Sequence, residues 1–389
     1  MTSQLRYRFL FAALICTPYP TSALAQLQRP LAPLELIEDE TNRAIERHEL
    51  PGAVVLIVSE EREIYRGAFG SRSLEPKQEK MTPDAIFDLA SLTKPVATAT
   101  SIFILREQKK LNLEEPVAKY WPEFGQNGKD KVTIEQCLLH TSGLINDNPI
   151  ADYDDGKAKA LERIAALKLE AEPGKRFRYS DVGYIVLGET VERVSGQSLD
   201  RFAHANIFQP LRMQGTGFWK IGEPIPPEVL TRMAPTTKEK DSWLIGQVHD
   251  PRARRLGGVA GDAGLFSTAA DLAIFCNMIL NGGEYGGRRI LLKESVEKMT
   301  EPCPVPGGLR TRGWDVDTAY SKNRGEFFPK SKTFGHTGFT GTSLWLDPAT
   351  QTAVIFLSNR VHPNEKGNVT RLRGTVSSLA AQAVGYGAK

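Results

Sequence analysis

Ser91 and Lys94 lie three residues apart in the stretch Phe87-Asp88-Leu89-Ala90-Ser91-Leu92-Thr93-Lys94-Pro95, where an apolar helical pattern begins. Residues i and i+3 are neighbours on a helix, so the amine of Lys94 can approach the hydroxyl of Ser91. Pro95 fits the first turn, where its missing N–H costs nothing. The helix dipole also favours negative charge developing near Ser91. The stretch therefore predicts an activated serine nucleophile with a base beside it.

The Ser-x-x-Lys pattern alone is weak evidence, because it recurs by chance about once in a chain of this length. Ser295 and Lys298 form such a match. Two later segments strengthen the case for Ser91: Tyr179-Ser180-Asp181 and, much further on, His336-Thr337-Gly338. The three segments occur in the order of the three signatures of serine β-lactamases and penicillin-binding proteins.

On these motifs the chain resembles the serine β-lactamase-like hydrolases, on the branch of class C enzymes, D,D-peptidases and family VIII-type esterases. The resemblance covers nearly all of the chain after its first 25 residues and includes three further segments: 138–144, 172–174 and 261–268. It implies an α/β, β-lactamase-like fold with the site between a sheet and a helical part.

The resemblance also implies roles for individual residues. Ser91 matches the nucleophile, and Lys94 and Tyr179 match the pair that handles its proton. The backbone amides of Ser91 and Phe339 match the oxyanion hole. A lysine acts as a base only if burial or a neighbouring cation lowers its pKa. The alternative for Tyr179 is an ordinary core tyrosine.

The third motif departs from the family pattern. His336-Thr337-Gly338 stands where Lys-Thr-Gly is usual, so a permanent cation is replaced by a group that is mostly neutral at pH 7. Unperturbed, this histidine would titrate near pH 6.5. We expect weaker binding of a substrate carboxylate at His336, Thr337 and Gly338, which favours an esterase, amidase or peptidase over an efficient β-lactamase. A structural, hydrogen-bonded histidine is the alternative.

Asp181 is the second departure, because Tyr-x-Asn is the usual form of the second motif. A carboxylate near Lys94 would favour the ammonium form and oppose its function as a base, which makes Tyr179 the better base candidate. Asp181 could instead bind a cationic group of the substrate or cap a loop. His249 and Asp250, in a glycine-rich region, are further candidates for lining the cleft.

Apolar patterns predict strands near both ends of the chain and helices between them. The expected strands are 53–59, 63–69, 342–346 and 352–357, and the expected helices are 34–50, 161–169, 184–194, 199–207, 269–280 and 370–384. This order indicates an antiparallel sheet built from both termini and flanked by helices, with a mostly helical inserted subdomain. The α/β part spans about 26–85 and 290–389, and the helical part about 86–289.

Residues 1–25 have the pattern of a secretory signal peptide: Arg6 and Arg8, an apolar run from Phe9 to Cys16, and Ala23-Leu24-Ala25. The apolar run is too short for a membrane span, although an uncleaved anchor is the alternative. We expect an exported protein, periplasmic or secreted. After cleavage, residues 26–389 should form one domain that is not stably inserted in a membrane.

The composition is that of an ordinary globular protein, with 41% hydrophobic and 24% charged residues among 389. The formal net charge of +3 falls to +1 when Arg6 and Arg8 are removed, and no basic stripe indicates a nucleic-acid partner.

The remaining cysteines are Cys137, Cys276 and Cys303, an odd number for which buried thiols are expected, although one bridge could form. No histidine or cysteine spacing typical of a metal site occurs, so neither a metal nor a cofactor is expected. The Gly-x-Ser-x-Gly motif of α/β-hydrolases is absent as well.

The sequence therefore predicts an exported serine hydrolase that forms an acyl-enzyme on Ser91. Its expected substrates are small esters or peptidoglycan-derived peptides, because the resemblance includes cell-wall amidases and carboxypeptidases with His-Thr-Gly. A β-lactamase is the alternative among enzymes. A non-catalytic cell-wall binding or scaffold protein is the alternative of another class, and the presence of Ser91, Lys94 and Tyr179 together argues against it. The oligomeric state is left open.

Overall fold

The computed structural model describes residues 32–387, so the predicted signal peptide lies outside the described residues. A large antiparallel sheet has the strand order β11-β12-β13-β14-β15-β16-β1-β2-β3. Its strands are β1 (Gly52–Ser59), β2 (Arg62–Ser73), β3 (Glu79–Lys80), β11 (Cys303–Val305), β12 (Gly308–Arg310), β13 (Asp315–Asp317), β14 (Phe334–Thr337), β15 (Ser343–Asp347) and β16 (Thr352–Ser358). The N-terminal hairpin thus pairs with the C-terminal hairpin through β1 and β16, as the sequence predicted.

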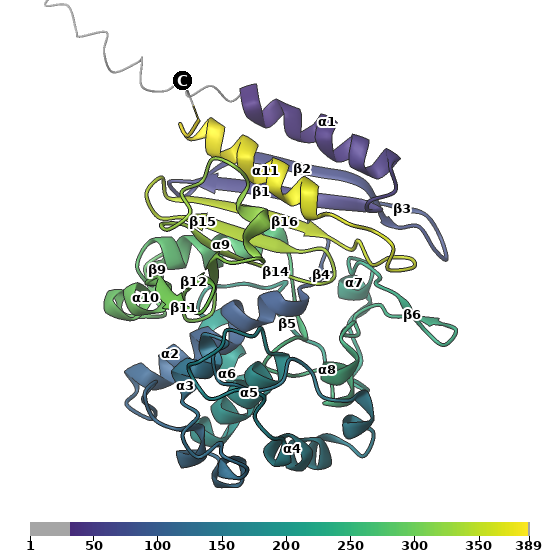
Figure 1. Cartoon of the computed structure of the whole chain (residues 1–389). Helices are drawn as coiled ribbons and strands as arrows, with labels where there is room; N and C mark the ends of the chain where they lie inside the picture. Colours follow the sequence, from purple (N-terminus) through teal and green to yellow (C-terminus); the bar gives the residue numbers. More distant parts are fainter. Residues whose placement is uncertain (1–31, 388–389) are drawn as a thin grey trace, which may run out of the picture.

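Alternating side chains of β1 face two separate cores, because successive residues of a strand point to opposite faces. Val55 and Ile57 pack with apolar residues of α1 (Ala32–Glu46) and α11 (Thr370–Ala383), which lie side by side over one face (Figure 1). Val54 and Leu56 belong to the larger core, which α9 (Ala269–Leu280) covers on the opposite face. A strand buried on both faces explains why 53–59 is almost continuously apolar.

The helical part lies below the sheet in Figure 1. Its helices are α2 (Thr100–Glu107), α3 (Ile134–Leu138), α4 (Lys157–Ala166), α5 (Asp181–Ser195), α6 (Leu199–Ala203), α7 (Pro227–Leu230) and α8 (Pro251–Arg255), while α10 (Lys293–Thr300) follows α9. Short helical turns are η3 (Ala90–Leu92), η4 (Lys94–Ala99), η5 (Val117–Lys119), η6 (Pro122–Gly125), η7 (Ile150–Tyr153), η8 (His204–Phe208) and η9 (Ser321–Arg324).

Short strand pairs complete the fold. β4 (Phe87–Asp88), β8 (Leu265–Ser267) and β5 (Gly217–Phe218) form one small antiparallel sheet, and β4 leads directly into the turn that carries Ser91. The other pairs are β6 (Lys238–Glu239) with β7 (Ser242–Trp243), and β9 (Glu284–Tyr285) with β10 (Arg288–Arg289).

The expected fold class is confirmed, and the differences are local. The helix expected at 161–169 is α4, which begins at Lys157 and ends at Ala166. It stops early because the carbonyl of Ala166 accepts from Asn127 Nδ2 and that of Leu167 from Lys129 Nζ, which satisfies the end of the helix. The helix expected from Ser91 begins there, but as the 3₁₀ turn η3 and the π-helical η4 before it becomes α-helical at Thr100.

Cys137 and Cys276 are buried free thiols, and burial raises the pKa of Cys137 to about 12. Cys303 is free and half-buried. Within residues 32–387, no helix has the length and apolar character needed to cross a membrane, and no group of three metal-ligating side chains is found.

Candidate active site

A strained turn presents Ser91. The carboxylate of Asp88 accepts hydrogen bonds from the backbone N–H of Ala90 at 2.8 Å and of His249 at 2.6 Å. Ala90 has φ +47°, a conformation that a non-glycine residue adopts only when its surroundings enforce it. Thr93 Oγ1 closes the turn by donating to the carbonyl of Ala90 at 2.7 Å. The carboxylate of Asp88 therefore fixes this turn, and Ser91 is held at the head of the helix.

Lys94 is fully buried and makes three short polar contacts. Its Nζ lies 3.0 Å from Ser91 Oγ, 2.9 Å from the carbonyl oxygen of Asp262 and 2.6 Å from Oδ1 of Asp181. Gly261 makes this approach possible, because a Cβ there would lie 1.9 Å from the carbonyl oxygen of Tyr184 in α5. The Ser91–Lys94 neighbourhood expected from the spacing is thus present, and α5 brings Asp181 to it.

Lys94 keeps its proton and its positive charge, unlike a lysine that could act as a base. Burial by itself lowers the pKa of Lys94, but the carboxylate of Asp181, followed by Tyr179, raises it above its ordinary value. Lys94 is therefore an ammonium group paired with Asp181. The sequence-based condition for Lys94 as a base, a lowered pKa, is not met.

Tyr179 lies between aromatic rings on one side and the polar groups of Ser91 and Lys94 on the other. Its hydroxyl is in hydrogen-bond contact with Ser91 and Lys94, and burial raises its pKa, so the phenol keeps its proton. The ring of His140 stacks on that of Tyr179, with centroids 4.3 Å apart. Nδ1 of His140 accepts the N–H of Ser180 at 3.0 Å, which fixes the chain beside the tyrosine. Tyr179 is buried, as a core tyrosine would be, but its hydroxyl points to the serine.

The third motif is tied directly to the segment before Ser91. Thr340 Oγ1 donates to the carbonyl of Asp88 at 2.7 Å, and Thr342 Oγ1 donates to that of Leu89 at 3.0 Å. A Cβ on Gly338 would lie 2.3 Å from the carbonyl oxygen of Leu89, so only glycine permits this approach. The backbone of Phe339 consequently runs beside the Ser91 turn, while its side chain is exposed. The oxyanion hole made by these two amides stays a prediction.

His336 lies at the end of β14 and is neutral. Its Nδ1 is 2.9 Å from the carbonyl oxygen of Thr337, which can only accept, so Nδ1 carries the proton and Nε2 is left as an acceptor. Burial, then the charges of Arg310 and Lys94, lower the pKa of His336 well below its ordinary value. The titration near pH 6.5 that holds for an unperturbed histidine therefore does not apply to it.

The remaining candidates from the sequence, Asp181, His249 and Asp250, have different partners in the structure. Asp181 is the first residue of α5, and Ser180 rather than Asp181 supplies the side-chain cap of that helix. Asp250 accepts the N–H groups of Arg252 and Ala253 and caps α8, so it does not pair with His249. The His249 ring stacks on Phe339 at 5.6 Å instead, and its Nε2 lies 2.9 Å from Glu365.

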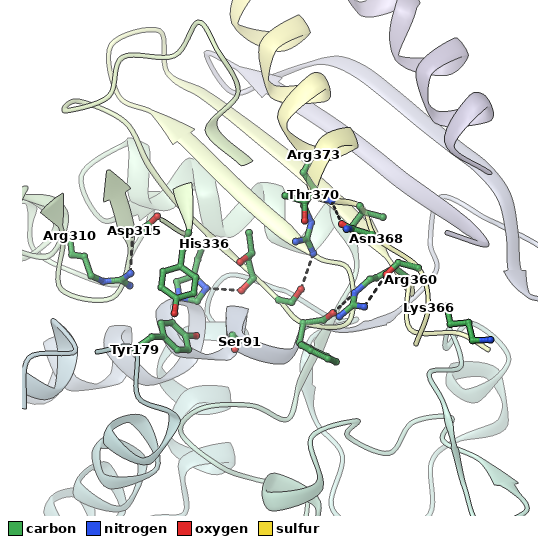
Figure 2. A pocket seen from close by; sticks show the side chains of 16 residues that line it. Ser91, Tyr179, Arg310, Asp315, His336, Arg360, Lys366, Asn368, Thr370 and Arg373 are labelled. Atoms are coloured by element: carbon green, nitrogen blue, oxygen red, sulfur yellow. Dashed lines mark hydrogen bonds and ion pairs between the residues drawn. The ribbon is translucent and has the colours of Figure 1, made fainter. Parts of the chain in front are cut away.

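A cavity of about 520 Å³ opens over Ser91 (Figure 2). Tyr179, His336, Thr337, Gly338 and Phe339 line it, as expected from the motifs. Its other lining residues include side chains that the sequence did not single out: Arg310, Asp315, Tyr320, Arg360, Lys366, Asn368, Thr370 and Arg373. They come from β12, β13, the loop before η9, the segment after β16 and the first turns of α11, and none of them belongs to a motif that could have indicated them.

Comparisons with known proteins agree with this architecture. A family model described as Beta-lactamase matches residues 36–375. A protein of Escherichia coli (strain K12) named "Putative D-alanyl-D-alanine carboxypeptidase" is 32% identical over 343 residues, which cover 80% of this chain and 79% of that protein.

Two solved structures have the same fold. A class C beta lactamase from Rhodobacter sphaeroides superposes with a TM-score of 0.70 at 21% identity, covering 88% of this chain and 98% of that chain. A family VIII carboxylesterase superposes with a TM-score of 0.68 at 21% identity, covering 90% of this chain and 97% of that one.

Proposed function

Because this chain belongs to the Beta-lactamase family of serine hydrolases, we propose that it hydrolyses an ester or amide bond through an acyl-enzyme on Ser91. The observation that carries this proposal is the 3.0 Å contact between Lys94 Nζ and Ser91 Oγ, with the hydroxyl of Tyr179 in hydrogen-bond contact with both groups. Small esters and peptidoglycan-derived peptides are the proposed substrates, since the related proteins are named as a carboxypeptidase and a carboxylesterase.

The proton of Ser91 needs an acceptor, and neither Lys94 nor Tyr179 is one in its resting state. Asp181 supplies the missing acceptor. As Ser91 Oγ attacks the carbonyl carbon, Lys94 takes the serine proton and passes one of its own to Asp181, so the lysine stays an ammonium. Tyr179 then donates its proton to the leaving group and regains one from Lys94, which recovers it from Asp181. The leaving group departs protonated, and Asp181 is again a carboxylate.

The backbone amides of Ser91 and Phe339 would stabilise the negative charge that develops on the carbonyl oxygen of the substrate. Loss of one such donor typically lowers the rate by on the order of 10²–10³. Water then hydrolyses the acyl-enzyme by the same groups acting in reverse. Export through residues 1–25 belongs to this proposal, because the pattern of Arg6, Arg8 and the apolar run after them is that of a cleavable signal.

The test is the intact mass after incubation with a fluorophosphonate, followed by assays with esters, D-amino-acid peptides, peptidoglycan fragments and cephalosporins. We expect one phosphonyl adduct, lost in Ser91→Ala, and turnover of an ester or peptide. Labelling without turnover of any compound would favour the binding-protein alternative, and turnover of cephalosporins alone would favour the β-lactamase.

The control is Ser295→Ala, which removes the serine of the other Ser-x-x-Lys match. Ser295 is buried in α10, with Arg106 Nη1 3.5 Å from its hydroxyl, and it does not line the cavity over Ser91. Its variant should be labelled like the wild type. Loss of labelling in Ser295→Ala rather than in Ser91→Ala would contradict the proposal.

A further inference from the structure

Two arginines hold the peptide groups on either side of Phe339. Nη2 of Arg373 donates to the carbonyl oxygen of Gly338 at 2.8 Å, and Nε of Arg360 donates to the carbonyl oxygen of Phe339 at 2.8 Å (Figure 2). The first contact is the informative one, because the carbonyl of Gly338 and the N–H of Phe339 belong to the same peptide group. That N–H is one of the two donors of the proposed oxyanion hole. Arg373 therefore binds the acceptor end of a predicted oxyanion donor.

The Gly338–Phe339 peptide group is fixed at its carbonyl end and free of protein partners at its N–H end. The carbonyl oxygen of Gly338 also accepts the N–H of Gly341 at 3.2 Å, so both of its lone pairs are used. The N–H of Gly338 donates to the carbonyl oxygen of Thr342 at 2.7 Å. Among the described residues, the N–H of Phe339 has no acceptor. This N–H is thus available to a substrate in the cavity, which Phe339 lines.

Arg373 is an unusual cation because it is buried without a counter-charge. It is 9% exposed, and its Nε has no hydrogen-bond partner. Burial, followed by the charge of Arg360, lowers the pKa of Arg373 to about 9, and no carboxylate of the described residues raises it. The guanidinium therefore keeps its charge at neutral pH in surroundings that disfavour it. A buried cation without a partner is costly, so its retention calls for a reason.

A cation bound to the carbonyl of a peptide group makes the N–H of that group a stronger donor. Hydrogen bonds in a chain polarise one another, and the effect is larger in a low dielectric and when one donor is charged. Asp315 is the carboxylate among the residues that line the cavity, and it is paired with Arg310, whose Nη1 lies 3.1 Å from its Oδ1. The positive charge of Arg373 is therefore left to act on the peptide group that it binds.

We propose that Arg373 is a positioning residue of the oxyanion hole, which holds and polarises the Gly338–Phe339 peptide group so that the N–H of Phe339 binds the developing oxyanion more strongly. This inference rests on the proposed acyl-enzyme function and adds a residue to it. In this role Arg373 acts through the peptide group and not by contact with the substrate. Its charge favours the transition state, which carries an oxyanion, over a neutral bound ester, so its effect belongs to kcat rather than to KM.

The first test uses an uncharged p-nitrophenyl ester, so that no carboxylate of the substrate can bind Arg373. Arg373→Met removes the charge and the donor, and it should lower kcat on the order of 10-fold or more while KM stays within about twofold. Arg373→Lys restores the charge and should recover part of kcat. Arg371→Met is the matched control, because Arg371 is exposed and faces Glu40 at 3.8 Å. An unchanged kcat in Arg373→Met would contradict the proposal.

The second test separates polarisation from a merely structural role. A neutral aryl trifluoromethyl ketone, isotopically labelled at the ketone carbon, adds to Ser91. The Oγ–C bond forms, the π electron pair moves to the ketone oxygen, and the serine proton enters the relay of Lys94 and Asp181. The carbon NMR shift of this hemiketal follows the ionisation of its oxygen.

Arg373→Met should raise the pKa of the bound hemiketal by about one unit, which corresponds to 10-fold weaker stabilisation of the oxyanion. Arg373→Lys should restore part of the shift, and Arg371→Met should leave the pKa of the hemiketal unchanged. A lower melting temperature of Arg373→Met together with an unchanged hemiketal pKa would reduce the arginine to a structural role and overturn the proposal.

These outcomes separate the two proposals. If Ser91 takes up the phosphonyl group and the ketone, but the hemiketal has the same pKa in the wild type and in Arg373→Met, only the role of Arg373 is wrong. If neither reagent modifies Ser91, the acyl-enzyme function is wrong and this inference fails with it. A loss confined to substrates that carry a carboxylate, with the neutral ester unaffected, would assign Arg373 to direct substrate contact and overturn the proposal.

Discussion

The two walls of the cavity treat buried charge in opposite ways. On the helical wall, Ser91 and Tyr179 line the cavity, and the buried ammonium group of Lys94 behind them has the carboxylate of Asp181 at 2.6 Å. On the sheet wall, formed by β14, the segment after β16 and the start of α11, the buried guanidinium of Arg373 donates to the carbonyl of Gly338, and its Nε has no hydrogen-bond partner. Both cations are out of water, but only the first has its counter-charge inside the protein.

This difference indicates that the two walls have different functions. A proton that must return to its starting point after each cycle is best moved within a closed, neutral set of groups, and Lys94 with Asp181 is such a set. We therefore expect substitutions on the helical wall to change proton transfer, and substitutions on the sheet wall to change how strongly the oxyanion is stabilised or which substrates are accepted.

The largest effect is expected when the proton relay of the helical wall is broken. Lys94→Ala and Tyr179→Phe should each lower the acylation rate by on the order of 10² or more. The double variant should lose little more than the worse single variant, because residues that act as one unit fail together. Stopped-flow acylation by a p-nitrophenyl ester measures this, with melting temperatures to check the fold. Additive losses would mean that the two groups act independently.

A smaller, pH-dependent effect is expected for Asp181→Asn. Without the carboxylate the pKa of Lys94 falls, because burial lowers it and Asp181 no longer raises it. Lys94 must then lose its proton before it can act, so the variant should be impaired by on the order of 10-fold near pH 6 and should recover as pH rises. The measurement is the pH profile of kcat/KM for a neutral ester. An equal loss at every pH would reduce Asp181 to a structural role.

The smallest effect is expected for His336 on the sheet wall. Because the pKa of His336 lies well below its ordinary value, the wild-type preference for acids over carboxamides should stay flat from about pH 5.5 to 8. His336→Lys should raise that preference by up to about 1 kcal/mol, since a partly solvated ion pair is worth little more. The ratio of kcat/KM for the two substrate types measures both. A preference that grows as pH falls through about 6.5 would show that His336 titrates normally.

Much of the fold could be predicted because it depends on local patterns. The run 53–59 is continuously apolar, as a strand buried on both faces must be, and it is found as β1. The start of the Ser91 helix was also correct, because Pro95 is a local signal for a first turn. The 3₁₀ and π geometry of η3 and η4 was not predictable, since these turns contact distant segments: Thr98 Oγ1 donates to the carbonyl of Gly261 at 2.7 Å, and Thr93 Oγ1 accepts the N–H of Leu265 at 3.1 Å.

For the candidate site, the sequence by itself determined which groups can react and how close two of them are. The i, i+3 spacing brings Lys94 to Ser91 whatever the rest of the chain does. The tertiary structure alone decided the protonation states, because a pKa depends on burial and on charges that come from elsewhere in the chain. Asp181 was a candidate from the sequence, but only the packing of α5 places its carboxylate beside Lys94. Arg373 had no signal at all, because an arginine in an amphipathic helix normally faces water, and only the packing of α11 against β16 and η9 buries its side chain at the cavity.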